Sequence, residues 1–173
     1  VFTDSLGNKT PVDTGLTIDN IDFDGDGIEN ELENNSANNG DGNGDGIKDY
    51  KQQSVASQIS PITNNPITLE SAGGECRIIN GYDVIAESDN DEEDGDYQYP
   101  YGLFDYELSC DEAGDTAQVI FYFDALYDTS NWVWRKYDRA SGGYATMQQV
   151  VTYGTAFIGG NEVTTASYSI TDG

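Results

Sequence analysis

From Val55 onward, the chain alternates short runs of β-branched and aromatic residues with turn residues. Most of these runs have four to nine residues. Several place apolar residues at every second position, which is the period of a half-buried β-strand. The stretch RASGGY, between two of the runs, predicts a hairpin connection. Such spacing is typical of a sandwich or barrel, and we expect an all-β fold that is an antiparallel β-sandwich. The runs are PITLES, ECRIIN, YDVIAE, LFDYELSC, AQVIFYFDA, NWVWRKYD, YATMQQVVTY and TASYSIT.

One run, AQVIFYFDA, is apolar on both of its faces. Val119, Phe121 and Phe123 share one face of an extended strand, and Ile120 and Tyr122 share the other. A strand at the edge of a sheet, or one with a face in water, would carry polar residues on one side. The pattern therefore predicts a central strand that is covered on both sides.

Residues 1–53 have a different composition. They are rich in glycine, asparagine and aspartate and nearly free of aromatic residues. Such a segment cannot bury enough apolar surface to fold alone, so we expect bound ions to order it. The sequence thus divides into a segment over residues 1–53 that we expect ions to order and an expected β-sandwich domain over residues 54–173.

The 32 acidic residues outnumber the 7 basic residues and give a net charge of −25. Nucleic-acid binders of the usual kind need a cationic surface, so that class is excluded, and binding to anionic membranes is disfavoured. No apolar run approaches the ~20 residues that a helix needs to span a bilayer. The chain has no histidine, which excludes Ser-His-Asp and Cys-His catalysis and the usual zinc sites. Glycosidases manage with two acids in a cleft, but the acids here cluster in glycine-rich loops, so we do not expect an enzyme.

Two twelve-residue stretches, DFDGDGIENELE (22–33) and DGNGDGIKDYKQ (41–52), share one pattern. A calcium loop of the EF-hand type takes ligands from positions 1, 3, 5, 7, 9 and 12 and needs glycine at position 6. Gly27 and Gly46 occupy position 6, which a solvated acidic linker would not require twice. We therefore predict two calcium sites. The first has Asp22, Asp24, Asp26, Ile28 through its carbonyl, Asn30 and Glu33; the second has Asp41, Asn43, Asp45, Ile47, Asp49 and Gln52.

The two sites are not expected to be equal. Asn43 and Gln52 are neutral, so the second loop carries less charge and should release its ion first. Asp19 could add a ligand to the first site or to a neighbouring one.

The chain contains two cysteines, Cys76 and Cys110. Together with calcium loops, an even cysteine count favours an extracellular protein, at the cell surface or secreted, with one disulfide. Two free buried thiols are the alternative.

Val1 suggests an internal cut from a longer chain, so we expect the protein to be part of a larger multi-domain chain.

The two acidic stretches resemble the calcium repeats of thrombospondin type 3 and of related bacterial extracellular proteins. The longer run DGNGDGIKDYKQQSVAS is followed by a cysteine-bearing β-rich region, YPYGLFDYELSC, VIFYFDALYDTSNWVWRKYD and VTTASYSITDG. This order resembles the choice-of-anchor U β-sandwich of bacterial surface proteins and the peptide-binding domains near the ends of long RTX adhesins. The resemblance covers most of residues 22–173. It implies calcium-dependent capture of a partner protein's C-terminal peptide on a host or another cell.

A further acidic run, ESDNDEEDGD (87–96), is followed at once by YQYPYG. It does not obey the twelve-residue spacing, and a solvated loop tip is one interpretation. The other is an irregular calcium site whose open positions accept a ligand carboxylate, with tyrosines as flat walls. The candidate ligand-binding residues are Asp89, Asp91, Asp94, Asp96, Tyr97, Tyr99 and Tyr101.

Trp132 and Trp134 lie two apart and share one strand face, which favours a place in the core over a recognition platform. Arg135 could pair with the acidic run or hold a ligand carboxylate, although a simple surface role is favoured.

The expected function is calcium-dependent adhesion through a protein ligand, in particular a peptide C-terminus. A calcium-stiffened spacer and a calcium-dependent carbohydrate-binding module remain as alternatives, and the sequence does not choose between sugar and peptide.

Overall fold

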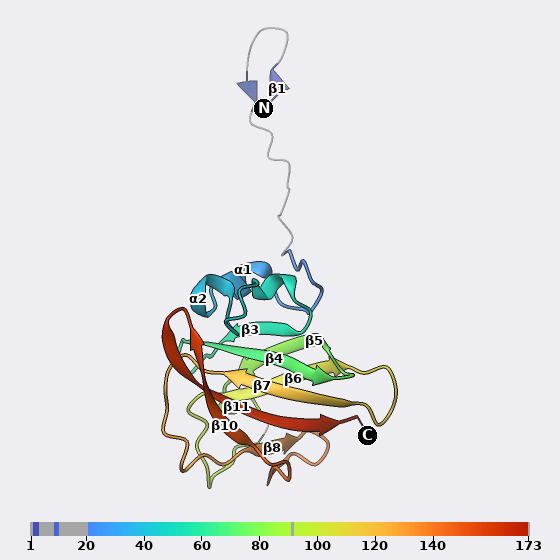
Figure 1. Ribbon diagram of the computed structural model, residues 1–173, viewed down its shortest axis with the longest axis vertical. Coiled ribbons are helices and arrows are strands. Elements are labelled where there is room, and N and C mark those ends of the chain that lie inside the picture. The colour runs from blue at the N-terminus through green and yellow to red at the C-terminus, as the bar shows by residue number, and fades with distance from the viewer. Residues whose placement is uncertain (1, 4–8, 11–20, 91, 173) are drawn as a thin grey trace.

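The structure, a computed structural model, describes residues 2–3, 9–10, 21–90 and 92–172. Its regular structure is mainly antiparallel β, and no described helix exceeds five residues, so the predicted all-β, sandwich-like fold is confirmed. Figure 1 shows the strands of the large sheet below α1 and α2, with β8 farther from the helices. The helical elements are α1 (Asn30–Asn34), α2 (Ala37–Gly40), η1 (Asp49–Lys51) and η2 (Glu87–Asp89). The strands are β1 (Phe2–Thr3), β2 (Lys9–Thr10), β3 (Val55–Ile59), β4 (Pro66–Gly74), β5 (Ile78–Ile85), β6 (Leu103–Ser109), β7 (Thr116–Tyr122), β8 (Arg135–Asp138), β9 (Gly143–Thr146), β10 (Thr152–Ile158) and β11 (Asn161–Thr171).

The largest sheet has five antiparallel strands in the order β10-β11-β7-β4-β3. In its central strand, β7, Phe121 lies opposite Leu69 of β4 and Ala166 of β11. All three side chains are fully buried, and Ile120 and Tyr122 on the opposite face of β7 are partly buried. The predicted central position of β7 is therefore confirmed, and its second face is only partly buried.

Two smaller sheets, β5–β6 and β8–β9, cover the Phe121 face of this large sheet. Phe104 of β6 and Trp134, just before β8, both contact the Phe121 ring, with centroid distances of 4.7 and 5.4 Å. The β8–β9 pair closes at Asp138 and Gly143, which confirms the predicted hairpin at RASGGY. The second layer of the fold is thus made of two separate pieces.

A disulfide joins Cys76 and Cys110, as predicted. Both cysteines lie just outside the open end of the β5–β6 pair, where Ile78 is opposite Ser109. The bond therefore ties the two strands together at the end that has no turn. A disulfide is compatible with an extracellular or secreted protein.

The Asp-rich loops pack against the large sheet at its edge strand β3. Ile28 belongs to the hydrophobic core and is 4% exposed. The Gln53 side chain donates a hydrogen bond to the backbone carbonyl of Asp24 at 2.6 Å. The predicted boundary between residues 53 and 54 falls where η1 passes into β3, and Asp19 lies outside the described residues.

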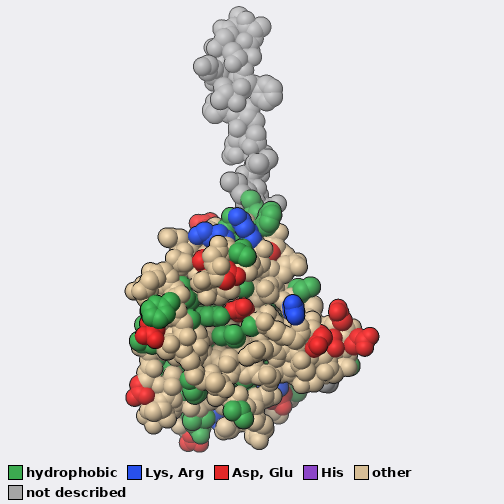
Figure 2. Space-filling view, viewed as in Figure 1, with side chains coloured by type: hydrophobic (Ala, Val, Ile, Leu, Met, Phe, Trp, Pro, Cys, Tyr) green, Lys and Arg blue, Asp and Glu red, His purple; other side chains and the backbone are tan. Residues whose placement is uncertain are grey.

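The charged side chains are spread unevenly over the surface. Figure 2 shows acidic side chains gathered on a loop that projects from one side of the molecule, and basic side chains near the end where the Asp-rich loops lie. Within the described segments, no helix has the length and apolarity to cross a membrane.

Candidate functional site

The two twelve-residue loops have the same backbone conformation. Glycine at position 6 has a φ of +90° in both loops, at Gly27 and Gly46. Glycine at position 4 has φ values of +80° at Gly25 and +77° at Gly44. Side chains disfavour this left-handed region, so the repeated glycines allow the chain to make the same sharp turn twice.

The hydrogen bonds inside the loops repeat as well. In each loop, the backbone N–H of position 6 donates to the carboxylate of position 1, at 3.0 Å in the first loop and 3.2 Å in the second. The N–H of position 7 donates to the carboxylate of position 5, at 2.8 and 2.7 Å. These bonds point the carboxylates at positions 1 and 5 into the loop, which is the arrangement that an ion-binding loop needs.

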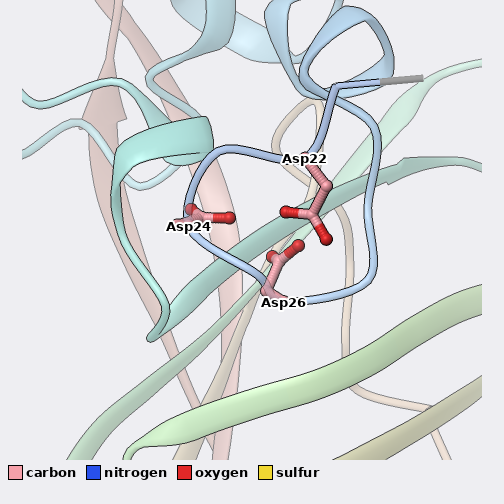
Figure 3. A group of neighbouring side chains, drawn as sticks. All are labelled: Asp22, Asp24 and Asp26. Atoms are coloured by element: carbon pink, nitrogen blue, oxygen red, sulfur yellow. The ribbon is translucent and has the colours of Figure 1, made fainter. Parts of the chain in front are cut away.

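The first loop brings three carboxylates together. Ligand atoms of Asp22, Asp24 and Asp26 lie within 4.8 Å of one another, and Figure 3 shows the three side chains pointing into the space that the loop encloses. Both side-chain oxygens of Asp24 and one of Asp26 are buried without a hydrogen-bond partner among the described residues. This group could hold a metal ion. Asn30, at position 9, accepts a hydrogen bond from the N–H of Phe23.

Helix α1 adds a fourth carboxylate. Glu33 is fully buried, and neither of its carboxylate oxygens has a hydrogen-bond partner in the described part of the chain. Burial, together with the nearby charges of Asp26 and Asp24, raises the pKa of Glu33 to about 10. Burial likewise raises the pKa of Asp26 to about 7. A buried charge without a partner is strongly unfavourable, so these groups need either protons or a cation.

The second loop satisfies its own polar groups more fully. Gln52, at position 12, donates at 3.4 Å to both the Asp45 carboxylate and the carbonyl of Ile47. Asn43 accepts a hydrogen bond from the N–H of Asp45 at 3.2 Å. One carboxylate oxygen of Asp41 remains buried without a partner among the described residues. The neutral amides thus take up hydrogen bonds where the first loop has only carboxylate oxygens.

Asp49, the position 9 residue of the second loop, joins the loop to the sheet. It is fully buried and accepts hydrogen bonds from the N–H of Gly42 and from the hydroxyls of Ser36 and Ser57. Ser57 also shares a hydrogen bond with Thr68 at 2.7 Å. Burial raises the pKa of Asp49, although these hydrogen bonds oppose the shift. The three hydroxyl residues could not be predicted from the sequence, because a serine before a short helix or a serine or threonine on a strand gives no signal that it lies near a buried acid.

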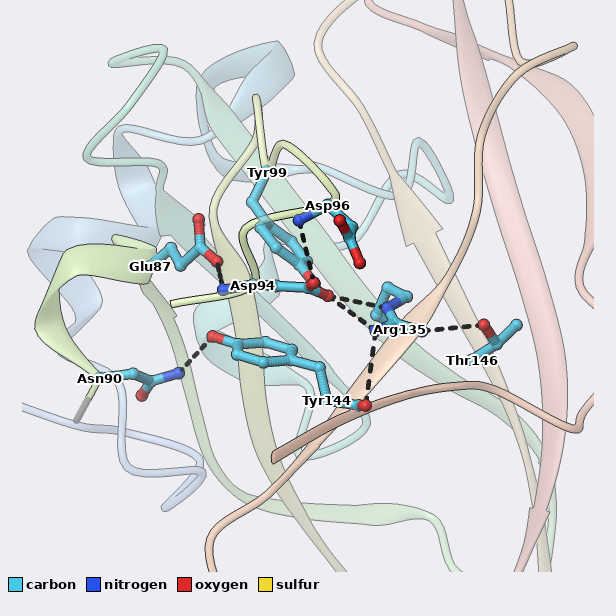
Figure 4. Close-up of polar contacts among 8 residues, drawn as sticks. All are labelled: Glu87, Asn90, Asp94, Asp96, Tyr99, Arg135, Tyr144 and Thr146. Atoms are coloured by element: carbon cyan, nitrogen blue, oxygen red, sulfur yellow. Dashed lines mark hydrogen bonds and ion pairs between the residues drawn. The ribbon is translucent and has the colours of Figure 1, made fainter. Parts of the chain in front are cut away.

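The acidic run at residues 87–96 is organised around an arginine. The Asp94 carboxylate pairs with Arg135 at 2.9 Å and accepts a hydrogen bond from the Tyr99 hydroxyl at 2.9 Å (Figure 4). The side chains of this pair are 8% and 13% exposed. Burial alone would raise the pKa of Asp94, but the hydrogen bonds from Tyr99 and Arg135 hold it below its usual value. The Arg135 guanidinium also lies 4.4 Å from the centre of the Tyr97 ring.

The other acids of this run have different roles. Asp89 accepts a hydrogen bond from the N–H of Ala86, and the N–H of Asp96 donates to Asp94. Asp91 lies outside the described residues. Among the described residues, Asp22, Asp24 and Asp26 form the one group of three convergent acids, so the calcium site at 87–96 stays a prediction.

A cavity of about 870 Å³ adjoins this run. Tyr97, Tyr99 and Tyr101, which the sequence singled out, all line it, and so do Trp132 and Trp134. Both tryptophans are partly buried and pack against the hydrophobic core. Core and recognition surface are alternatives from the sequence, whereas in the structure both tryptophans pack against the core and also line the cavity.

These features define an all-β, disulfide-linked protein with an acidic loop that could hold a metal ion. No protein-family model, curated protein or solved structure matches the chain. The resemblance to adhesin domains therefore stands on the sequence motifs.

Proposed function

We propose that the chain is a calcium-dependent extracellular adhesion module that binds a protein ligand. In this proposal, the first loop holds calcium through Asp22, Asp24, Asp26 and Glu33, together with the carbonyl of Ile28. The observation that carries it is the burial of Glu33 and Asp26 with carboxylate oxygens that have no partner among the described residues. A divalent cation would compensate these charges.

The donor set favours calcium over other divalent ions. Every candidate ligand atom is oxygen, and the chain has no histidine. Zinc prefers nitrogen and sulfur ligands in proteins, and magnesium usually keeps several waters and is held by one or two carboxylates. Calcium takes six to eight oxygen ligands and tolerates irregular geometry, which suits a loop with four carboxylates.

The second loop is proposed as a weaker calcium site. Asp41, Asn43, Asp45 and the carbonyl of Ile47 would bind the ion, and the Gln52 amide would have to turn its oxygen inward. Asp49 already accepts hydrogen bonds from three donors, so its main role would be to fix the loop on the sheet and not to bind the ion. Calcium would in this way stabilise β3 as well as the loops.

The cavity supports a binding role over a simple spacer. A spacer needs stiff connections and no aromatic recess, whereas ligand sites are concave and lined by aromatic residues with a few polar groups. The disulfide is in keeping with a place at the cell surface or in secretion. The family resemblance points to a peptide or protein on another cell surface as the partner, with the chain as one part of a longer adhesin of the RTX kind. A calcium-dependent carbohydrate-binding module is the second candidate, since aromatic rings also stack on sugars.

A ligand screen with and without EGTA tests the proposed function. The immobilised protein is exposed to free sugars and to peptides with free or amidated C-termini. We expect peptides with a free C-terminus to bind in the presence of calcium. Their binding should disappear when EGTA removes the calcium. Binding that survives EGTA with the fold intact, or binding of sugars alone, would contradict the proposal.

A further inference from the structure

The aromatic cavity lies at the break in the second layer of the fold. One side is formed by β6, through residues 103–106, and the other by residues 131–137, which lead into β8. Phe123 and Tyr168 of the large sheet form its floor. Within the described chain, β6 pairs only with β5 and β8 only with β9, so the second layer has no ladder across this gap.

Consecutive residues line both sides of the gap. On the face of a strand only every second side chain would line a cavity, because neighbouring side chains point to opposite faces. Here residues 103–106 and 131–137 contribute without interruption. For β6, the uninterrupted lining, together with the lack of a second partner strand among the described residues, indicates that its free edge with backbone N–H and C=O groups borders the cavity. A strand edge without a partner is a template for another extended chain.

Cationic residues are concentrated beside this gap. The chain has only 7 basic residues against 32 acids, yet Arg135, Lys136 and Arg139 lie within five positions. Arg135 pairs with Asp94 of the 87–96 run, and Arg139 pairs with Asp105 of β6, so both arginines already have acidic partners. Lys136 lines the cavity, is exposed, and forms no ion pair with any described residue. It is therefore the cation that remains for a ligand.

We propose that the cavity binds an extended acidic peptide segment, which lies between β6 and residues 131–137 as an added strand and places an acidic side chain on Lys136. This inference rests on the proposed function, because it specifies the partner of the binding module. It differs from capture of a C-terminus by calcium, since the segment is internal and the cation is a lysine. A span of about five residues, ~17 Å long, matches an ordinary strand.

The chemistry of the cavity gives each part of such a segment a partner. Apolar side chains on the inward face would cover the partly exposed rings of Trp132 and Trp134, and burial of aromatic and aliphatic surface would supply most of the affinity. The backbone of the segment would pair along the edge of β6 that faces the cavity, because β6 pairs only with β5 within the described chain. A sugar would use the rings but not the edges, so the backbone requirement separates the two ligand classes.

Tryptophan emission provides a direct readout, because Trp132 and Trp134 are the chain's two tryptophans and both line the cavity. The probes are synthetic peptides, N-acetylated and C-amidated, with alternating valine and threonine and one aspartate near the end. Two matched peptides replace the aspartate by lysine or carry N-methyl groups at alternate backbone positions. Glucose and glucuronate are titrated as the sugar ligands for comparison, and all titrations are done in saturating calcium.

We expect the aspartate peptide to shift the emission saturably and to bind about tenfold or more tightly than the lysine peptide, because a charged hydrogen bond contributes about 1.5–3 kcal/mol. The N-methylated peptide should not bind. Lys136→Glu should reverse the preference between the aspartate and lysine peptides. Lys51→Glu, a charge change of the same kind on η1, should leave the preference unchanged.

Three results would overturn the inference. One is equal binding of the N-methylated peptide, another is a response to the sugars alone, and the third is an unchanged preference in Lys136→Glu. If the capped peptides fail while peptides with free C-termini still bind in calcium, this inference is wrong and the proposed function stands. If calcium has no effect on any ligand but the capped aspartate peptide binds, the cavity is a peptide site and the calcium-dependent mechanism is wrong.

Discussion

Glu33 and Gln52 occupy the same position in two loops of the same backbone, and their surroundings differ. Glu33 is fully buried with both carboxylate oxygens unpartnered among the described residues, whereas Gln52 closes its loop with hydrogen bonds from its amide. Together with the change from Asp24 to Asn43 at position 3, this difference separates a loop with several unpartnered carboxylate oxygens among the described residues from a loop that is more fully hydrogen-bonded.

Exchange of these two residues should change the calcium affinities of the two loops in opposite directions. Glu33→Gln removes a charged ligand and is expected to weaken the first site by about 10- to 100-fold, comparable with the loss of a second-shell partner or more. Gln52→Glu should tighten the second site. Calorimetric titration measures both, and Glu31→Gln, an exposed position on the same helix, is the matched control. Equal affinities of the two wild-type loops would contradict the expected inequality.

Asp94 predicts a response to acid. Its pKa in the folded protein lies below the ordinary value of 3.8, so its contribution to stability is present above pH 3.8 and is lost as the pH falls through the lowered pKa. Acidification into this range should release Arg135 and loosen the 87–99 loop. Tyrosine and tryptophan emission across an acid titration reports this change. Asp94→Asn should lack this acid-dependent step; an identical acid profile in the variant would show that Asp94 is not its source.

At the scale of elements, the local sequence predicts strands well and their arrangement poorly. The two-faced apolar pattern of β7 was enough to place it at the centre of a sheet, and the RASGGY turn was enough to predict the β8–β9 hairpin. The break in the second layer could not be predicted, because it depends on which distant strands pair. For the same reason, the ion pair of Asp94 and Arg135, 41 positions apart, was only one of several alternatives.

The contact of the second loop with β4 predicts a sensitive glycine. A Cβ atom at Gly42 would lie 2.1 Å from the Thr68 hydroxyl and 2.8 Å from the Asp49 carboxylate. Gly42→Ala should therefore push the loop from the sheet and lower the free energy of unfolding by about 1–3 kcal/mol. Gly81→Ala, where no atom lies within 4 Å, is the control in a urea titration. Equal stability of the two variants would show that the loop is not packed as described.

At the scale of the whole molecule, the net charge of −25 opposes compaction, and the buried acids of the loops concentrate that cost. The loops also pack on β3 and contribute Ile28 to the hydrophobic core. Ion binding and folding are therefore expected to be coupled through the entire domain.

Calcium should raise the thermal unfolding midpoint of the domain. A ligand that binds only the native state stabilises it by about 2.7 kcal/mol when its concentration is 100 times the Kd. Differential scanning calorimetry with calcium and with EGTA measures the shift, and magnesium at the same concentration is the control for ionic strength. An unchanged midpoint after thorough chelation would contradict the coupling.

The disulfide has a mechanical consequence. If the domain is stretched between residues 21 and 172, the force passes through the bond between Cys76 and Cys110, and the residues between them are bypassed. The 34 positions that separate the cysteines then cannot contribute to the extended length, and this loss amounts to about 116 Å at ~3.4 Å per residue. In a single-molecule pulling experiment, reduction of the bond should lengthen the unfolded domain by that amount. A module that holds one cell to another under flow would give way over a shorter distance while the bond is closed.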